Sequence, residues 1–280
     1  MKVAVIIDSS AGIKNIKDFK DLHLVPLMIT KENGEQISDD EHFSFDEFYK
    51  LNDSQLLKIS MTIPGVMMKK WDELLKSYDN IVCLLLSKGL SSQFETYNML
   101  AKDEKYAGKV FVVDTNGVSV VLKQQVLDTI ELIKEGKTGQ GILEVIESRN
   151  NNFKCFIIPK TLDQLVRGGR ISKAAASMAK FLKINPILKY DGKIDKEGKT
   201  RTFKKAILEA LELLRKRTKS KTMELDVSYS RTDEETLKFV LAAIEEKGFK
   251  IRLKEDIPNT ITCHTGRDTF ALSIWDTNIK

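Results

Sequence analysis

The chain has 280 residues, of which 42% are hydrophobic and 30% charged, with 15 glycines and 5 prolines. This balance is typical of a folded globular protein and excludes a disordered or fibrous chain. The formal net charge is +5, but the basic residues are interleaved with acidic ones, so the sequence gives little support to a nucleic-acid-binding surface.

The aliphatic runs are too short for a membrane span. The longest, residues 81–86, is far below the roughly 20 residues that a spanning helix needs. Only Lys2 precedes the first apolar run, residues 3–7, so that run predicts a buried strand rather than an export signal. The 3 cysteines have no close pair, which favours reduced thiols over disulfides or a metal site. We therefore expect a cytoplasmic protein without a metal.

Short apolar runs alternate with longer segments of helical periodicity, which predicts an α/β fold with a largely parallel sheet in the first half. The expected strands there are residues 2–7, 24–29, 81–86 and 109–113, and the expected helices are residues 44–51, 65–77, 92–102 and 118–134. A glycine-containing stretch at residues 135–141, a helix to about residue 149 and the polar run 150–152 predict a boundary between two domains, 1–150 and 151–280.

The second half predicts a mixed sheet with helices. A strand begins near residue 155, and residues 184–190 turn at Asp191-Gly192 into 193–194, which is a hairpin signal. The remaining expected elements are helices at residues 162–166, 173–181, 204–217 and 234–247, and strands at residues 222–228, 249–254 and 269–275.

Polar residues follow two of the expected strands at the point where each strand ends. Asp8 and Ser9 come directly after the first strand, and Asp114 and Thr115 come after the fourth. Open α/β sheets bind ligands at the carboxyl ends of their strands, so these residues are candidates for a ligand crevice. The alternative is that they form only turns and helix caps.

Two further polar segments precede expected helices. Residues 87–92 follow the third strand, and their hydroxyl and N–H groups, those of Ser87 and Ser91 among them, suit an anion at a helix N-terminus. Thr62 lies just before Pro64, which suits a first helical position. Capping by Ser91 or Ser92 alone is the alternative interpretation.

The second half holds two more candidate segments. Paired glycines at residues 168–169 allow close backbone approach and orient Arg170, with Ser172 as a helix cap. His264 and Thr265 lie in an expected glycine-containing loop ahead of the last strand. The first segment is also compatible with a plain helix–helix turn, and a single loop histidine is more often structural than functional.

One stretch of the second half carries a specific resemblance. Residues 162–176, LDQLVRGGRISKAAA, continuing to residues 184–188 and 191–194, closely resemble the DegV family of fatty-acid-binding proteins. Asp8-Ser9-Ser10, residues 87–94, Asp114-Thr115, Arg201 and His264-Thr265-Gly266 occur in the family's order and spacing. The resemblance therefore extends over essentially the whole chain.

This resemblance implies a two-domain α/β protein that buries one long-chain fatty acid in an apolar tunnel between the domains, with its carboxylate near their junction. It also implies the lipid-presenting subunit of a bacterial fatty acid kinase, whose separate catalytic subunit brings ATP. The chain is then a lipid-binding subunit and not an enzyme by itself. It has no cofactor, no nucleic-acid partner and no membrane span, and it contacts the membrane only transiently for lipid exchange.

The resemblance also assigns roles to residues. The family's hydroxyl donors to the carboxylate fall on Thr62 and Ser91, within residues 61–64 and 87–93. The residues associated with the head group and the kinase reaction fall on Arg170, Arg201 and His264. The expected ligand-binding residues are Thr62, Ser91, Ser87, Asp8, Ser9, Asp114, Thr115, Gly169, His264 and Thr265.

The sequence departs from the family's pattern at four positions. Met61 stands where the family usually has Thr, Ile63 replaces Gln, and Ser92 and Gln93 replace Gly and Thr. Thr62 keeps its hydroxyl. The loss of polar groups at Met61 and Ile63 is compatible with a differently shaped ligand, a shifted head group or a paralogue with altered coupling to the kinase.

A second function class is a free-standing enzyme acting on a small phosphorylated or hydroxylated metabolite. Serines at strand ends and a histidine suggest a hydrolase. The sequence contains no Gly-x-Ser-x-Gly nucleophile motif, however, and no catalytic pairing is evident for His264. It also lacks a Walker-type phosphate-binding loop, so we expect ATP to come with the partner kinase.

Overall fold

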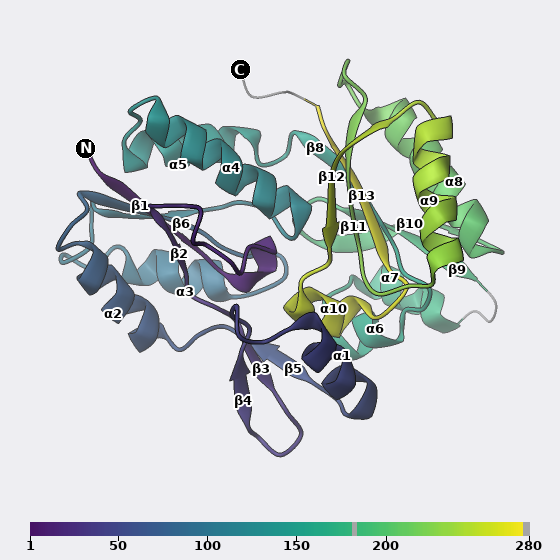
Figure 1. The fold of residues 1–280 in the computed structure, drawn as a ribbon, viewed down its shortest axis with the longest axis horizontal. Coiled ribbons are helices and arrows are strands. Elements are labelled where there is room, and N and C mark those ends of the chain that lie inside the picture. Colours follow the sequence, from purple (N-terminus) through teal and green to yellow (C-terminus); the bar gives the residue numbers. More distant parts are fainter. Residues whose placement is uncertain (181–183, 277–280) are drawn as a thin grey trace. The chain divides into compact units, whose positions relative to one another are not determined.

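A computed structural model describes residues 1–180 and 184–276 (Figure 1). The chain divides into two units, Met1–Asn150 and Asn151–Lys280. Each unit contains a β-sheet with helices, which confirms the predicted α/β class.

The first unit is built on a parallel sheet with the strand order β2-β1-β6-β7. All five residues of β1 (Val3–Ile7) and all five of β6 (Asn80–Leu84) are buried, because helices cover both faces. The outer strands are β2 (Leu22–Leu24) and β7 (Val110–Val113). The chain leaves β1 toward β2 on one side and later forms β6 and β7 on the other. The point where the strand order reverses therefore lies between β1 and β6, where sheets of this type bind ligands.

Two helix pairs cover this sheet, as Figure 1 shows. On one face, α4 (Val120–Lys134) and α5 (Gly139–Arg149) contribute apolar side chains to one buried cluster. On the other face, α2 (Pro64–Leu74) and α3 (Gln93–Leu100) form a second cluster, which includes the fully buried Trp71. Pro64 occupies the first turn of α2, as predicted.

The expected strand at residues 24–29 is wrong as a single element. The chain leaves the parallel sheet at Leu24 and enters a separate sheet at Met28. Pro26 lies between the two strands, and because proline has no N–H it interrupts a strand ladder. The second sheet is antiparallel, with β3 (Met28–Thr30) between β4 (Gln36–Ser38) and β5 (Lys58–Ser60). In the chain, α1 (Phe45–Ser54) connects β4 to β5.

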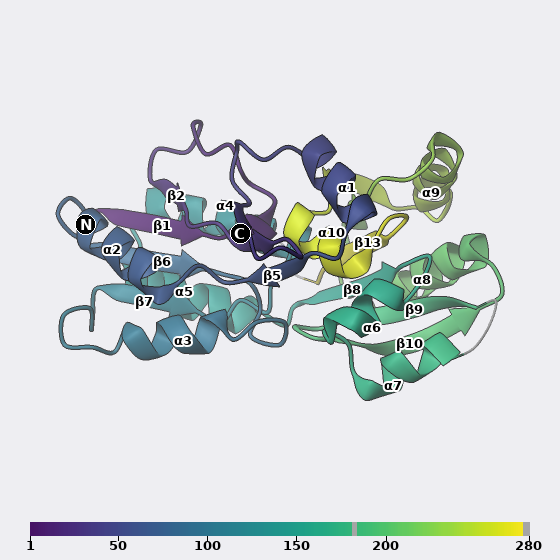
Figure 2. The ribbon, with the colours of Figure 1, turned by 90° about the horizontal axis from the view of Figure 1, so that it is seen from below.

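The second unit has a mixed sheet with the strand order β10-β9-β8-β13-β11-β12. Its strands are β8 (Phe153–Ile158), β9 (Asn185–Tyr190), β10 (Ile194–Thr200), β11 (Glu224–Tyr229), β12 (Lys250–Asp256) and β13 (Phe270–Trp275). Among the described strands of this sheet only β11 and β12 pair in parallel. The predicted hairpin at Asp191-Gly192 is confirmed, and Gly192 has a φ of 97° that a turn glycine adopts without strain. Figure 2 shows β8, β9 and β10 side by side.

One face of this sheet packs against α8 (Phe203–Arg217) and α9 (Glu234–Glu246). The buried residues of α8 recur every three or four positions, from Ala206 to Leu214, as expected for an amphipathic helix. Three short helices, α6 (Asp163–Gly168), α7 (Lys173–Ala176) and α10 (Asn259–Thr265), complete the unit with the 3-10 turn η2 (Ser177–Lys180). The end of the expected helix 173–181, residue 181, lies outside the described residues.

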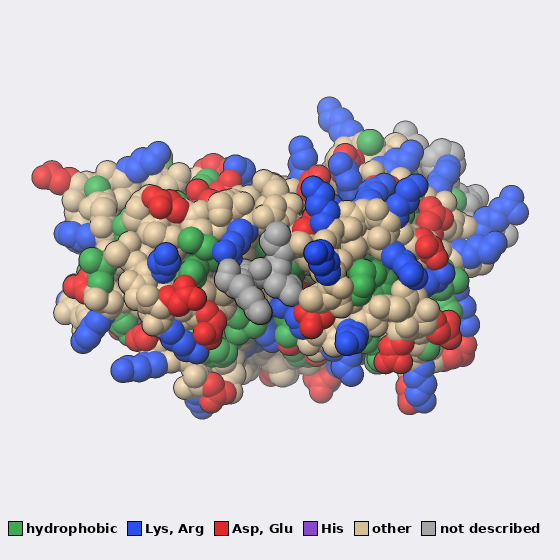
Figure 3. Space-filling model, turned by 90° about the horizontal axis from the view of Figure 1, so that it is seen from above, with side chains coloured by type: hydrophobic (Ala, Val, Ile, Leu, Met, Phe, Trp, Pro, Cys, Tyr) green, Lys and Arg blue, Asp and Glu red, His purple; other side chains and the backbone are tan. Residues whose placement is uncertain are grey.

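The described helices include none whose length and hydropathy would allow it to cross a bilayer. On the face drawn in Figure 3, basic and acidic side chains lie intermixed.

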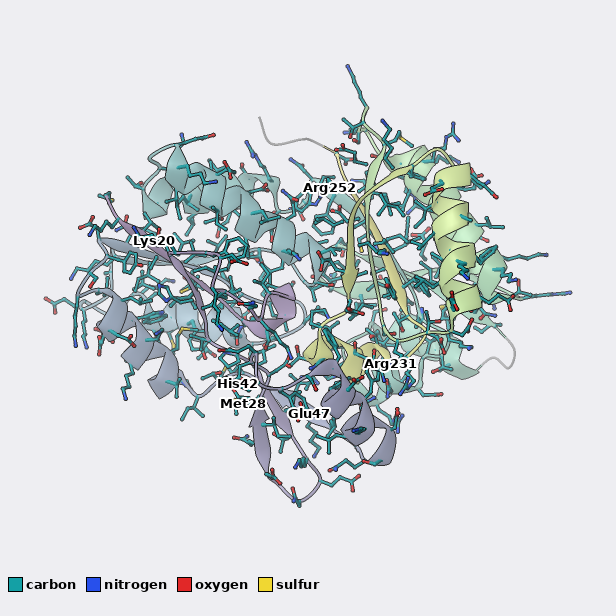
Figure 4. The ribbon with its side chains drawn as sticks, viewed as in Figure 1. Lys20, Met28, His42, Glu47, Arg231 and Arg252 are labelled. Atoms are coloured by element: carbon teal, nitrogen blue, oxygen red, sulfur yellow. The ribbon has the colours of Figure 1, made fainter. Side chains whose placement is uncertain are left out.

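A charged pair links the edge strand β12 to its neighbour. Arg252, labelled in Figure 4, donates from Nε to Asp226 Oδ1 at 2.9 Å and from a second nitrogen to Oδ2. The Asp226 side chain is 1% exposed, and burial raises the pKa of Asp226 to about 6 although the Arg252 charge opposes the rise. Folding therefore favours the protonated carboxyl, and the contribution of Asp226 to stability decreases as the pH rises from about 4 through about 6.

We predict that Arg252→Met destabilises the chain more at about pH 7.5 than at about pH 5, because the unpaired Asp226 is charged only at the higher pH. The expected loss at the higher pH is roughly 2 kcal/mol, below the ~3–5 kcal/mol of a fully buried pair because Arg252 is partly exposed. Urea unfolding at both pH values measures it. Lys254→Met, on the same strand, is the control, and an equal loss at both pH values would contradict the prediction.

Candidate functional site

The buried carboxylate of Asp8 lies where the strand order of the first sheet reverses. Its Oδ1 accepts hydrogen bonds from the N–H of Ser10 at 2.8 Å and from the Ser10 hydroxyl. Its Oδ2 accepts from the N–H of Leu86 at 2.8 Å and from the side-chain amide of Gln93 at 2.6 Å. Burial raises the pKa of Asp8, and these hydrogen bonds oppose the rise. Asp8 thus ties the end of β1 to the residues after β6 and to the start of α3.

A second set of hydrogen bonds links Ser9 to Thr62. The N–H of Leu27 donates to Ser9 Oγ at 2.9 Å, and the Thr62 hydroxyl donates to the carbonyl oxygen of Pro26. The carbonyl oxygen of Thr62 accepts from the Tyr97 hydroxyl at 2.6 Å. The single hydroxyl hydrogen of Thr62 is therefore already used, and a carboxylate ligand has to displace Pro26 to receive it.

The loop between β6 and α3 holds Ser87 and Ser91. The N–H of Ser87 donates to the carbonyl of Gly117 at 3.0 Å, and the N–H of Ser91 donates to the carbonyl of Ser87 at 3.1 Å. Ser91 Oγ accepts from the N–H of Gln93 at 3.2 Å, and no described residue accepts the Ser91 hydroxyl hydrogen. Ser92 precedes α3 but its side chain makes no capping bond, so the expected cap at this position is wrong for Ser92. Ser91 keeps a donor for a ligand.

Asp114 and Thr115 follow β7, as predicted, and their side chains contact other residues of the first unit. Asp114 forms an ion pair with Lys88 at 2.5 Å. The Thr115 hydroxyl donates to the carbonyl of Leu85 at 2.8 Å and accepts from the N–H of Gly117 at 3.0 Å. Thr115 therefore fixes the loop after β7 against the residues after β6.

His264 lies in the last turn of α10, so the expected loop at this position is wrong. Three of the seven residues of α10 are threonines, which have low helix propensity, so the sequence pattern did not indicate this helix. Packing supplies the missing stabilisation, because α10 contacts α6. The imidazole lies so close to Gly168 that a Cβ there would approach His264 Nδ1 to 2.5 Å, and only glycine fits without displacement of the ring.

Arg170 acts on the same imidazole from the end of α6. Its guanidinium donates to the carbonyl of Gly168 at 2.5 Å, and Gly169, with a φ of 64°, turns the chain between them. Burial, followed by the charge of Arg170, lowers the pKa of His264 to about 4. His264 is therefore neutral near neutral pH, with a cation beside it. The predicted cap at Ser172 is confirmed.

The other two predicted residues of the second unit are Thr265, which follows His264 at the end of α10, and Arg201, which lies just before α8. The Thr265 hydroxyl is buried without a hydrogen-bond partner among the described residues, and so is Oε1 of Gln164. A Cβ at Gly266 would approach that Oε1 to 2.5 Å. Arg201 is exposed just before α8, and no described hydrogen bond joins it to His264.

Two residues of these networks, Tyr97 and Gln164, were not proposed as site residues from the sequence, and Gln93 was named only as a departure from the family's pattern. Gln93 and Tyr97 are both buried and lie four positions apart on α3, and this helical spacing of polar residues was an available signal. No group of three or more His, Cys, Asp or Glu side chains in the described part of the chain is arranged to hold a metal ion.

The parallel sheet with polar strand ends, and the mixed sheet with its glycine-flanked arginine and histidine, define an α/β protein of the DegV type. The sequence model of that family, described as "Uncharacterised protein, DegV family", matches residues 2–277. The chain therefore belongs to the DegV family.

Known relatives cover the chain at nearly full length. A DegV domain-containing protein of Mycoplasma genitalium is 28% identical over 290 residues, 98% of this chain and 98% of the relative. The structure of DegV from Bacillus subtilis, described as a fatty acid binding protein, is 26% identical, with a TM-score of 0.82 over 98% of each chain. A Thermotoga maritima protein, described as revealing fatty acid binding function, is 26% identical, with a TM-score of 0.80 over 98% of this chain and 99% of that one.

We predict that the His264 imidazole titrates near a pKa of about 4 and that Arg170→Met raises this pKa, because one of its two causes is removed. NMR titration of the ring signals measures both values. Arg167→Met on α6 is the control, since its charge is not among the causes of the shift. A pKa unchanged by Arg170→Met would contradict the described contact.

Proposed function

We propose that the chain binds a long-chain fatty acid and presents its carboxylate to a separate fatty acid kinase for acyl phosphate formation in the cytoplasm. The observation that carries the proposal is membership of the DegV family over residues 2–277. Two solved structures that match almost the whole chain at 26% identity are described as fatty acid binding. The kinase partner rests on the resemblance of residues 162–176 and on the arginine and histidine that this segment and α10 supply.

The acyl tail supplies most of the affinity in this proposal. Burial of each methylene contributes ~0.8 kcal/mol, so about fifteen methylenes contribute roughly 12 kcal/mol before chain and translational entropy are lost. A hydrogen bond to the carboxylate contributes ~1.5–3 kcal/mol and opposes a large desolvation cost. The hydroxyl groups therefore determine where the carboxylate lies more than whether the lipid binds.

Ser91 is the stronger candidate for the head-group donor. Its hydroxyl hydrogen has no acceptor among the described residues, whereas the hydrogen of Thr62 is donated to Pro26. Thr62 is proposed as the second donor, which requires its hydroxyl to rotate away from Pro26 when the ligand binds. Asp8, Ser9, Ser87, Asp114 and Thr115 hold the loops that carry these two donors.

The proposed transfer places a carboxylate oxygen of the lipid in line with the γ-phosphorus of ATP, which the kinase brings. A new bond forms between that oxygen and phosphorus, the bond to ADP breaks, and negative charge develops on the transferring group. Arg170 and Arg201 are proposed to stabilise that charge. The carboxylate nucleophile is already ionised and needs no base, so neutral His264 is proposed to orient it by a hydrogen bond, with Gly169 and Thr265 shaping the surroundings.

We predict that the chain as isolated, or after incubation with palmitate, carries one acyl chain in native mass spectrometry, and that the added mass disappears under denaturing conditions. If the protein carries no acyl chain either as isolated or after incubation with palmitate, the proposal is wrong. Esterase activity or a gel shift with DNA in the same preparation would favour the other function classes.

We predict that the double variant Thr62→Ala with Ser91→Ala folds normally and loses acyl phosphate formation more than lipid retention, because the tail holds the lipid. Ser91→Ala alone should account for most of the loss, about tenfold, since one charge-assisted hydrogen bond is removed. The assay follows acyl phosphate formed with the kinase and ATP, beside lipid retained after gel filtration. Ser148→Ala, an exposed serine of α5, is the control. Unchanged turnover in the double variant would exclude this head-group site.

A further inference from the structure

Gln93 contacts two residues of the site, one through its side chain and one through its backbone. Its side chain is 2% exposed, and its amide donates to the Asp8 carboxylate at 2.6 Å. Its backbone N–H donates to Ser91 Oγ at 3.2 Å. A single residue therefore connects the buried Asp8 to the hydroxyl that is free to donate to a ligand.

These contacts determine how the Ser91 hydroxyl is oriented. The hydroxyl oxygen has two lone pairs and one hydrogen, and the N–H of Gln93 occupies one lone pair. The first residue of α3 is held in turn by Asp8, whose second oxygen also accepts from the N–H of Leu86. The position of Ser91 Oγ is thus fixed relative to β1 and β6 through one side-chain amide.

We infer that Gln93 is a positioning residue that makes the site selective for a free carboxylate by fixing the Ser91 hydroxyl. This inference rests on the proposed fatty acid function. It concerns a position at which this chain departs from the Thr that is usual in the family, and it gives that departure a role in recognising the head group.

The test compares palmitate with its methyl ester, which has the same tail and no charge, in wild-type protein and in Gln93→Met. Wild-type protein should prefer the acid, and Gln93→Met should reduce the acid-to-ester affinity ratio about tenfold while affinity for the ester stays nearly constant. Gln93→Asn keeps an amide but is one methylene too short to reach Asp8, and it should show the same loss. Gln124→Leu, which removes a Gln–Asp hydrogen bond on α4, should leave the ratio unchanged.

A double-mutant cycle with Ser91→Ala separates positioning from a general structural role. If Gln93 acts through the Ser91 hydroxyl, Gln93→Met should change the ratio less than about twofold once that hydroxyl is absent. An undiminished ratio in both Gln93→Met and Gln93→Asn, or an equal loss with and without Ser91, would overturn the inference while the proposed function stands. Wild-type protein that binds neither the acid nor the ester would overturn both.

Discussion

The first unit depends on the burial of one carboxylate, that of Asp8. A carboxylate removed from water needs donors on both oxygens, and here they come from the turn after β1, from Leu86 just beyond β6 and from α3. These hydrogen bonds to Asp8 therefore fix the positions of β1, β6 and α3 relative to one another. The same requirement brings residues 87–93 next to the reversal point of the sheet, where the free hydroxyl of Ser91 lies.

In the second unit, a steric constraint determines how α10 packs against α6. The His264 ring is packed against Gly168, at the end of α6, so closely that a side chain at that position would displace the ring. Arg170 follows after one left-handed glycine, and burial, assisted by the charge of Arg170, lowers the pKa of His264 and keeps the imidazole neutral. Close packing, and not a salt bridge, thus determines the protonation state of the histidine.

The sequence predicted most strands of the parallel and the mixed sheet, because buried parallel strands are continuous apolar runs and the hairpin at Asp191-Gly192 has a characteristic turn. It did not predict β4 and β5 of the small antiparallel sheet, the break at Pro26 or the helix at residues 259–265. The helix depends on packing against α6 more than on local propensity, whereas Pro26 itself was an available signal for the break. It placed polar groups correctly at strand ends. It did not indicate which hydroxyls are free, because the partner of Thr62 lies 36 residues away in the chain.

The two outer strands of the mixed sheet differ in how they are covered. β10 is met at Ile194 by a bridge to Ile171 and by the N–H of Ser172. Among the described strands β12 has a neighbour on one side only, β11, and it carries Lys250, Arg252 and Lys254. Another copy that paired its own β12 there would bring like charges together and lose their hydration. These basic residues thereby oppose edge-to-edge association at β12.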